Sequence, residues 1–359
     1  MALGLEVQGL TKSFGKETIL RDISFSLEVG KTGVIVGTSG VGKTTLLNII
    51  AGVVRADTGR ISIDGNVVED SNEARVRSVE RNIGYVFQDY LLFPHMSVFD
   101  NVAFGLRARH ISSSTITEKV SNVLDAVGLS ELRDKKPDQI SGGQKQRISL
   151  ARAMVLEPKL LLLDEPLSAL DRQTREVLRV ELKKIFTKLE TTALYVTHDL
   201  DEAFFFGERI GIMRSGSLPF FGDKNALLTH MNRSTAEFLG FNLLKAQFLR
   251  LNGSDYVFLL SDWNCEVPLQ LASQPELGAK DQIILAISPS SLRLSVDHDS
   301  GLVARVKEVW EFKDRVQIVV ESREQKMISE ISSQEFRELL PKPGDILQVV
   351  IGHAYPVSD

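Results

Sequence analysis

The sequence predicts an α/β fold over residues 1–240, followed by a small all-β domain over residues 241–359. Three observations lead to this fold class. Apolar strand-like runs such as residues 160–163 alternate with helical stretches, and a strand with no polar face belongs in a parallel sheet covered by helices. A glycine-rich segment joins one such strand to a helix. After about residue 240, short alternating stretches separated by turn residues take over, which is typical of a small barrel or sandwich.

Strands dominate the beginning of the first domain. The expected strands are residues 5–10, 19–27, 32–36, 60–63 and 66–68. Gly30-Lys31 marks the turn before the third of them, and Asp64-Gly65 is a strong hairpin signal between the last two. Residues 44–51 favour a helix that stops at Gly52. Strand, glycine-rich loop and helix therefore follow one another in the order that a phosphate-binding loop requires.

Helices and buried strands alternate in the rest of the first domain. The expected helices are residues 97–136, 141–156, 200–206 and a stretch around Leu178 and Leu182, and the expected strands are residues 159–163 and 192–197. Apolar residues at three- and four-residue spacing, such as Val120, Val123 and Leu124, identify the helical segments. This alternation predicts helices layered on a sheet.

The second domain reads as strands with one helix. The expected strands are residues 256–260, 283–287, 302–309, 316–321, 326–331 and 346–351. Residues 334–340 favour a helix, because Ser332 and Glu335 have the spacing of a capping box. Two domains also fit the length, since 359 residues are more than one compact domain usually needs.

Composition limits the classes of partner and compartment. The chain has 42 Lys and Arg against 47 Asp and Glu, a formal net charge of −5, so it lacks the basic footprint of a nucleic-acid-binding protein. Cys265 is the only cysteine, which excludes an intramolecular disulfide and favours a reducing compartment. No apolar run approaches the roughly 20 residues of a membrane span, and the N-terminus does not resemble a signal peptide. We expect a cytoplasmic chain that reaches a membrane only through partners.

The glycine-rich segment has the pattern of a loop that holds the phosphates of ATP. Its glycines let backbone N–H groups turn toward an anion, and the helix that follows adds the positive end of its dipole. Lys43 is expected to reach the β- and γ-phosphates, and the hydroxyl of Thr44 to reach Mg²⁺. The expected nucleotide-binding residues are Gly37, Thr38, Ser39, Gly40, Val41, Gly42, Lys43, Thr44 and Thr45.

Two acidic residues end the apolar run at residues 160–163. The carboxyl edge of a parallel sheet is where α/β proteins bind ligands, so Asp164 and Glu165 are expected near the phosphate loop. Asp164 is expected to hold Mg²⁺, and Glu165 to orient and deprotonate the attacking water.

Further motifs make the assignment specific. Ser141-Gly142-Gly143-Gln144 precedes the acidic strand, Gln88 ends Tyr-Val-Phe-Gln, Asp171 ends Ser-Ala-Leu-Asp, and His198 lies in Tyr-Val-Thr-His-Asp. In this order and spacing, the set resembles the ATP-binding-cassette (ABC) ATPases of the P-loop NTPase class over roughly residues 3–240. The resemblance implies a RecA-like core, an antiparallel β subdomain and a helical subdomain.

The resemblance also implies a role for each motif. Ser141, Gly142, Gly143 and Gln144 look like the signature loop, which closes over ATP bound by a second copy, so that neither copy holds a complete site. Asp171 looks like the dimer-contact aspartate, and His198 like the switch histidine at the γ-phosphate. Gln88 resembles the glutamine that contacts Mg²⁺ or water, and Phe14 the aromatic that stacks on adenine.

Import is suggested by two further features. Residues 89–98, with apolar Tyr90, Leu91, Leu92, Phe93 and Met96, resemble the helical-subdomain entry of importer ATPases, where an apolar cleft receives a helix of the membrane permease. The C-terminal domain, through Ala286-Ile287-Ser288-Pro289 and the run from Gly301 to Glu308, resembles the oligonucleotide-barrel-like (OB-like) regulatory and dimerisation domain of one importer subfamily. Members of that subfamily serve sugars, sulfate, molybdate or tungstate, ferric iron and polyamines.

The resemblance therefore implies a homodimeric ATPase on the cytoplasmic face of the cell membrane, bound to permease subunits through the Gln88 loop and the helical subdomain, and served indirectly by an extracytoplasmic substrate-binding protein. An inorganic ion, either an oxyanion or ferric iron, is the preferred cargo, with a sugar or polyamine as alternatives. Two other functions stay open at this point. One is a soluble ABC ATPase acting in DNA repair or on ribosomes, and the other is a mainly regulatory protein that senses a ligand through residues 241–359.

Overall fold

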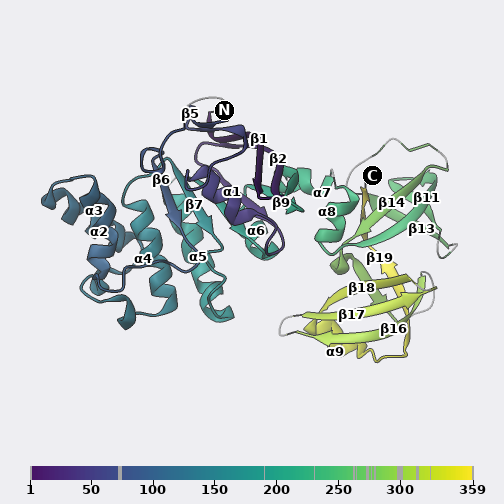
Figure 1. Ribbon diagram of the computed structural model, residues 1–359. Coiled ribbons are helices and arrows are strands. Elements are labelled where there is room, and N and C mark those ends of the chain that lie inside the picture. Colours follow the sequence, from purple (N-terminus) through teal and green to yellow (C-terminus); the bar gives the residue numbers. More distant parts are fainter. Residues whose placement is uncertain are drawn as a thin grey trace. The chain divides into compact units, whose positions relative to one another are not determined.

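The computed structural model describes residues 2–71, 75–189, 191–229, 231–261, 263, 265–271, 275, 277–278, 280–296, 302–312, 315–323 and 325–357. Gly301, named above, lies outside the described residues. The chain divides into two compact units, Met1–Lys224 and Asn225–Asp359. Figure 1 colours them from purple to green and from green to yellow. No helix in the described part of the chain is long and apolar enough to cross a membrane.

A six-stranded sheet forms the centre of the first unit. Its order is β10-β9-β3-β8-β7-β6, with β6 at Ile83–Val86, β7 at Leu160–Asp164, β8 at Thr192–Thr197, β3 at Thr32–Val36, β9 at Arg209–Arg214 and β10 at Ser217–Gly222. All pairs are parallel except β9 with β10. Every residue of β3, β7 and β8 is buried, as the lack of a polar face predicted. The carboxyl ends of these three strands meet at one edge of the sheet.

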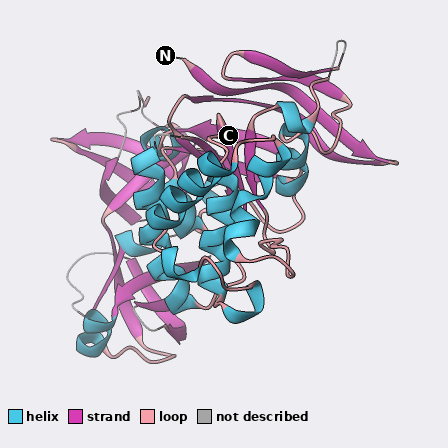
Figure 2. Ribbon diagram, turned by 90° about the vertical axis from the view of Figure 1, so that its left-hand side faces the viewer, coloured by secondary structure: helices cyan, strands magenta, loops and turns pink. Residues whose placement is uncertain are grey.

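A four-stranded antiparallel sheet packs on the phosphate-loop side of this core. Its order is β2-β1-β4-β5, with β1 at Leu3–Phe14, β2 at Glu17–Glu28, β4 at Thr58–Ile63 and β5 at Asn66–Asp70. Figure 2 shows it as a layer of long strands beside the helices. Inward residues such as Leu5 and Ile61 join one apolar cluster with Leu46 of α1 (Lys43–Ile50) and Leu162 of β7. This shared core holds the loop between β3 and α1 in place.

A buried ion pair anchors the far end of α1. Arg81 donates to the carbonyl oxygens of Ile49 and Ile50 at 2.9 Å each, and it also hydrogen-bonds Glu69. The side chains of Arg81 and Glu69 are 0% and 3% exposed. The guanidinium thus satisfies carbonyl groups that a helix C-terminus leaves without partners.

The helices of the first unit form two groups. Three of them, α2 (Val98–Ala108), α3 (Ser113–Ala126) and α4 (Gly142–Met154), share a second apolar core that includes Val102, Val120 and Ile148. Each begins at a serine whose hydroxyl accepts an N–H of the first turn: Ser97, Ser112 and Ser141. The other two, α5 (Arg172–Leu189) and α6 (Leu200–Phe206), follow β7 and β8. The single helical stretch expected over residues 97–136 is instead two helices, α2 and α3, and ends at Ala126, whereas the alternation of helices with buried strands agrees with the prediction.

The second unit is built on a closed five-stranded barrel. The barrel order is β11-β12-β13-β20-β14, with β11 at Asn242–Asn252, β12 at Asp255–Leu260, β13 at Cys265–Leu271, β14 at Gln282–Ile287 and β20 at His353–Val357. Its pairs are antiparallel except β13 with β20. A closed five-stranded barrel is the architecture expected of an OB-like domain.

A second sheet is inserted between the fourth and fifth strands of the barrel. Its order is β15-β19-β16-β17-β18, with β15 at Leu292–Ser295, β16 at Leu302–Glu311, β17 at Arg315–Ser322, β18 at Gln325–Ser332 and β19 at Ile346–Ile351. The helix α9 (Ser333–Leu339) follows β18 behind the predicted Ser332–Glu335 capping box. Leu285 of the barrel and Ile318 of the inserted sheet belong to one apolar cluster, so the two sheets share a core.

The units divide earlier in the chain than the boundary near residue 240 expected from the change in strand pattern. The reason lies in α7 (Lys224–Thr229) and α8 (Arg233–Phe238), which precede β11. Ala236 of α8 and the neighbouring Met231 are buried in one cluster with Ala286 and Val357 of the barrel. These residues therefore belong by packing to the second unit.

Candidate functional site

The phosphate loop is a tight backbone turn between β3 and α1. Gly40 and Gly42 have φ of 80° and 110°, the left-handed region that glycine adopts without strain. A Cβ on Gly37 would lie 2.5 Å from the carbonyl oxygen of Met213, and one on Gly42 would lie 2.9 Å from Leu20. Thr38 and Ser39 between these glycines are exposed. The loop is thus fixed at both ends and open to solvent in the middle.

Lys43 brings a positive charge to the loop. Its Nζ donates to the carbonyl oxygens of Gly37 at 2.8 Å and Thr38 at 3.1 Å, and it lies 3.2 Å from Oε1 of Glu165. The side chain is only 4% exposed. A buried ammonium beside the free N–H groups at the start of α1 creates a strong preference for an anion there.

Thr44 and Asp164 face each other across the loop and the end of β7. The Thr44 hydroxyl donates to Oδ1 of Asp164 at 3.1 Å, and the Tyr85 hydroxyl donates to Oδ2 at 3.4 Å. Burial raises the pKa of Asp164, with the hydrogen bond from Thr44 acting in the opposite direction. Burial and the charge of Asp164 together raise the pKa of Tyr85. Tyr85 was missed by the sequence analysis: it opens the Tyr-Val-Phe-Gln motif, three residues before Gln88, but nothing in that motif shows which strand lies beside β7.

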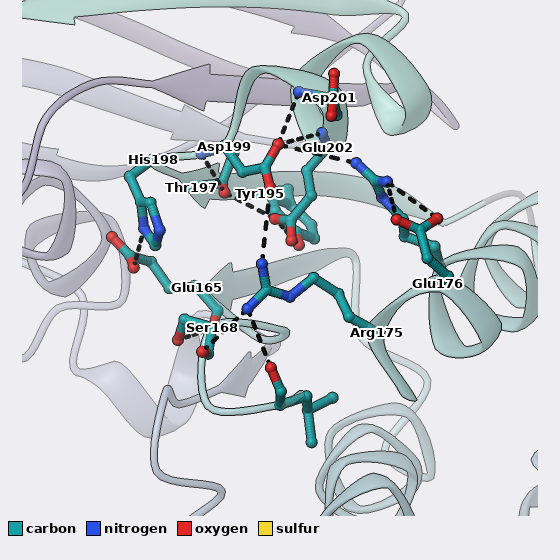
Figure 3. Close-up of polar contacts among 12 residues, drawn as sticks. Glu165, Ser168, Arg175, Glu176, Tyr195, Thr197, His198, Asp199, Asp201 and Glu202 are labelled. Carbon is teal, nitrogen blue, oxygen red and sulfur yellow. Dashed lines mark hydrogen bonds and ion pairs between the residues drawn. The ribbon is translucent and has the colours of Figure 1, made fainter. Parts of the chain in front are cut away.

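Glu165 stands at the centre of the cluster. Its Oε1 faces Lys43, and its Oε2 lies 2.7 Å from Nδ1 of His198 (Figure 3). The backbone of Glu165 has φ of 42°, which is uncommon for a residue with a side chain. Its N–H donates to the carbonyl oxygen of Val196 at 3.0 Å, so the end of β8 holds it in this conformation. Strain of this kind gathers at functional sites.

The segment around His198 is fixed by a buried network that the sequence analysis missed. The hydroxyls of Tyr195 and Thr197 both donate to Oε2 of Glu202 at 2.7 Å (Figure 3). Burial raises the pKa of Glu202, which is 3% exposed. The carbonyl oxygen of Thr197 also accepts the N–H of Gly37 at 3.3 Å. This network ties the residue before His198 to the start of the phosphate loop.

For three other predicted site residues, the described contacts include none with this cluster. Gln88 is exposed, two residues beyond β6, the strand beside β7. Phe14 ends β1 with its ring 52% exposed and the Lys12 ammonium 5.2 Å from the ring centre. Asp171 is exposed and accepts the Thr174 N–H at 3.1 Å, a bond that lowers its pKa.

The predicted signature loop caps α4. The Ser141 hydroxyl accepts the Gln144 N–H at 3.3 Å, and the Gln144 side chain accepts the Ser141 N–H at 2.9 Å. A Cβ on Gly143 would lie 3.1 Å from Thr174 of α5, whereas Ser141 and Gly142 are exposed. Among the described residues, no hydrogen bond joins this loop to residues 37–45. The first residues of this helix start, Ser141 and Gly142, are thus presented to solvent.

An apolar groove opens between β6 and the helical subdomain. It encloses about 370 Å³ and is lined by Tyr85, Phe87, Leu91, Phe93, Phe104 and Arg152, among others. The rings of Phe93 and Phe104 lie 4.6 Å apart, and Arg152 donates to the Leu91 carbonyl oxygen at 2.7 Å. Of the apolar residues expected to form a docking cleft, Leu91 and Phe93 line this groove, whereas Leu92 packs against the helical-subdomain core.

Comparison with known proteins decides the family. The ABC transporter family profile matches residues 20–168, which include the phosphate loop, Gln88, the signature loop and the acidic pair. A sulfate/thiosulfate import ATP-binding protein of Chromobacterium violaceum is 38% identical over 357 residues, covering 98% of this chain and 94% of the relative. The chain belongs to the import ATP-binding proteins of ABC transporters. It is therefore an ABC transporter ATPase, and the alternative of an ATPase for DNA repair or ribosomes is set aside.

Two further comparisons agree with this ABC ATPase assignment. A molybdate/tungstate import ATP-binding protein of Thermococcus kodakarensis is 37% identical over 318 residues, covering 87% of this chain and 92% of the relative. The solved structure of cbiO1 from Clostridium perfringens, part of the ABC transporter complex cbiONQ, aligns with a TM-score of 0.57 at 30% identity. That alignment covers 62% of this chain and 89% of the other. The predicted α/β ATPase domain followed by a β-rich domain is confirmed.

Proposed function

We propose that this ABC ATPase is the energy-coupling subunit of an uptake transporter for an inorganic oxyanion, and that Glu165 is its general base. The observation that carries the catalytic part is the position of the Glu165 carboxylate. It lies 3.2 Å from the Lys43 ammonium and 2.7 Å from the His198 imidazole. A base in this position stands beside the phosphate loop, where a water attacking the terminal phosphate must be deprotonated.

The residues around Glu165 would bind the phosphates and orient the base. The phosphate-loop N–H groups and Lys43 bind the phosphates and neutralise charge as the terminal phosphoryl group transfers. Nδ1 of His198 holds the Glu165 carboxylate, leaving its other ring nitrogen to face the γ-phosphate. Because His198 is 46% exposed and Glu165 is 14% exposed, the base is partly shielded while the histidine stays accessible.

Mg²⁺ fits the oxygen-rich side of the site. The Thr44 hydroxyl and the Asp164 carboxylate lie 3.1 Å apart, and hydroxyl and carboxylate oxygens are donors that Mg²⁺ prefers. In the described chain, no cluster of three or more His, Cys, Asp and Glu is placed to hold a metal ion. A small number of protein ligands is what a Mg²⁺ site needs, because Mg²⁺ is usually bound by one or two carboxylates together with substrate phosphates and water. Thr44, Asp164 and Gln88 would hold the ion, which would neutralise phosphate charge.

A second copy of the chain would complete the site. The signature loop presents the free start of α4 to solvent, and the helix dipole and free N–H groups there attract a phosphate. We propose that Ser141 to Gln144 close over ATP held by the partner's phosphate loop, with Asp171 at the contact between copies. Phe14, half-exposed at the end of β1, would stack on the adenine.

The groove beside β6 would receive the permease. Its aromatic and aliphatic lining suits the apolar face of a short helix, and it adjoins the loop that carries Gln88. Docking of a membrane subunit there would hold the chain peripherally at the cytoplasmic face of the membrane. An extracytoplasmic binding protein would then act on the permease, without contacting this chain.

An oxyanion cargo has the most support from the relatives. Sulfate/thiosulfate and molybdate/tungstate import proteins are 38% and 37% identical over 98% and 87% of this chain. A spermidine/putrescine import protein of Hahella chejuensis is 39% identical over 82% of this chain, which makes a polyamine the second candidate. Ferric iron and sugars have no comparable support among these relatives.

Uptake assays would test the cargo. A strain lacking this chain is expected to regain uptake of radiolabelled sulfate or molybdate when it is complemented with the wild type. Complementation with Glu165→Gln is expected to restore no uptake. Spermidine uptake by the same strains serves as the comparison. Restoration of spermidine uptake alone would replace the oxyanion with the polyamine.

Co-purification with the permease tests the docking surface. Phe104→Glu places a charge in the groove and is expected to abolish capture of the permease while leaving ATP binding intact. The matched control is Phe205→Glu, at an exposed phenylalanine of α6 outside the groove. Equal capture by the two variants would contradict docking at this groove.

A further inference from the structure

One arginine lies between the two loops that flank the catalytic cluster. Arg175 is in the first turn of α5, and its Nη2 donates to the carbonyl oxygens of Leu170 at 3.1 Å and Ser168 at 3.5 Å (Figure 3). Its Nη1 lies 3.9 Å from Oδ2 of Asp199. A single guanidinium therefore contacts the loop after Glu165 and the residue after His198.

Two of its three partners connect to the reacting pair: Ser168 by a hydrogen bond to Glu165, and Asp199 as the next residue in the chain after His198. The Ser168 hydroxyl donates to the carbonyl oxygen of Glu165 at 2.8 Å. The Asp199 N–H donates to the Thr197 hydroxyl at 3.0 Å, and Asp199 Oδ1 accepts the Asp201 N–H at 2.7 Å as the cap of α6. A displacement of either segment is therefore expected to shift Glu165 or His198.

The chemistry of these contacts favours arginine. A planar guanidinium can donate in several directions at once, whereas a lysine ammonium on a flexible stem acts as a single point charge. The Arg175 side chain is 27% exposed, so solvent weakens the attraction to Asp199 and the value of the contact is mainly geometric. Arg179, one turn further along α5, lies 3.8 Å from Asp199 but pairs with Glu176 rather than with the Ser168 loop.

We propose that Arg175 is a positioning residue that couples the loop from Ser168 to Asp171 to the Glu165–His198 pair. This inference rests on the proposed function, in which that loop meets the second copy. When the two copies close on ATP, movement of this loop would be transmitted through Arg175 to Asp199. His198 and Glu165 would thereby take up the positions needed for hydrolysis. ATP binding does not depend on this link, because the phosphate loop is held by Thr197 and the β3–α1 core.

Kinetics of Arg175 variants separate positioning from a structural role. Arg175→Gln is expected to lower kcat by about 10- to 100-fold, the cost of a small misplacement of catalytic groups. ATP affinity, measured by equilibrium dialysis, is expected to stay within about threefold, because only interactions made in the transition state are lost. Arg175→Lys should recover only part of kcat, because an ammonium can still donate to the Leu170 carbonyl oxygen but cannot span both loops as the guanidinium does. Lys184→Gln removes a positive charge from an exposed position of the same helix and is the control.

A double-mutant cycle tests the coupling itself. If Arg175 transmits the position of the Ser168–Asp171 loop to the catalytic pair, Asp171→Ala and Arg175→Gln interrupt the same link. The double variant should then have a kcat close to that of the slower single variant. Multiplying effects, or a wild-type kcat in Arg175→Gln, would overturn the proposal, and so would a parallel loss of ATP affinity and melting temperature in both Arg175 variants. A wild-type kcat in Asp171→Ala combined with a low kcat in Arg175→Gln would instead count against the shared site between copies.

Discussion

Glu165→Gln is the sharpest test of the catalytic assignment. The amide has the shape of the carboxylate, so it can still contact Lys43 and His198, whose atoms lie 3.2 Å and 2.7 Å from the native oxygens. What it loses is the capacity to accept a proton from water. The side chain is 14% exposed, and no apolar packing is removed, so the fold is expected to be unchanged.

The size of the expected rate loss follows from the role of Glu165 as general base. Removing a general base costs about 10²- to 10⁴-fold in rate. This corresponds to roughly 2.7–5.5 kcal/mol of activation free energy, at 1.36 kcal/mol for each tenfold. Neutralising Glu165 also removes the carboxylate that competes with phosphate for the Lys43 ammonium, so ATP affinity is expected to stay equal or become tighter. Turnover should therefore fall while ATP affinity does not.

The assay is steady-state and single-turnover phosphate release by the purified chain, together with equilibrium dialysis against ATP. The exposed Glu131 provides the control, Glu131→Gln, which removes the same charge away from the site. Wild-type hydrolysis in Glu165→Gln would refute Glu165 as the base. Loss of ATP binding in that variant would show that the carboxylate supports the phosphate loop rather than the chemistry.

Three further outcomes are expected. Ser141→Arg should block hydrolysis while each chain still binds ATP, since it puts a bulky cation at the exposed start of α4; undiminished turnover would contradict a shared site. Arg81→Ala should lower the free energy of unfolding by roughly 3 kcal/mol in guanidinium titrations, because it leaves the buried Glu69 carboxylate with Arg75 alone and removes the donor to the carbonyl oxygens of Ile49 and Ile50; a loss under 1 kcal/mol, roughly an exposed-pair value, would refute this. Burial raises the pKa of Glu202 above its ordinary value of 4.5, so the stability from its neutral form is present below about pH 4.5 and lost as pH rises through the raised pKa. Urea titrations should therefore show Glu202→Gln gaining stability over the wild type as pH rises, and a pH-independent difference would contradict the burial effect.

Much of the nucleotide site could be read before the fold was known. The phosphate loop and the Asp164–Glu165 pair each follow an apolar strand, and parallel strands bring their carboxyl ends to one edge. Tyr85 and Glu202 could not be found this way. Their roles depend on which strand lies beside β7 and which side chain lies under the end of β8, and neither leaves a local pattern.

The barrel was predicted less completely than the ATPase core. Only β12 and β14 of its five strands were expected from alternation; β11 was missed, and so were the closing strands, β13 and β20. Each of these carries a proline, Pro268 or Pro356, and proline argues against a strand because it cannot donate to the ladder. Both prolines nevertheless pair in register, opposite Val257 and Leu285.

The sequence by itself determined the family, the phosphate loop and the acidic pair, because these depend on residue types at fixed spacing along one stretch of chain. The tertiary structure alone decided that Glu165 stands between Lys43 and His198, that Arg175 joins two loops, and that α7 and α8 pack on the barrel. Those contacts join residues far apart in sequence, and only packing and strand order bring them within hydrogen-bonding distance. The signature loop lies between these cases: its capping box is local, whereas the phosphate it is proposed to meet belongs to a second copy.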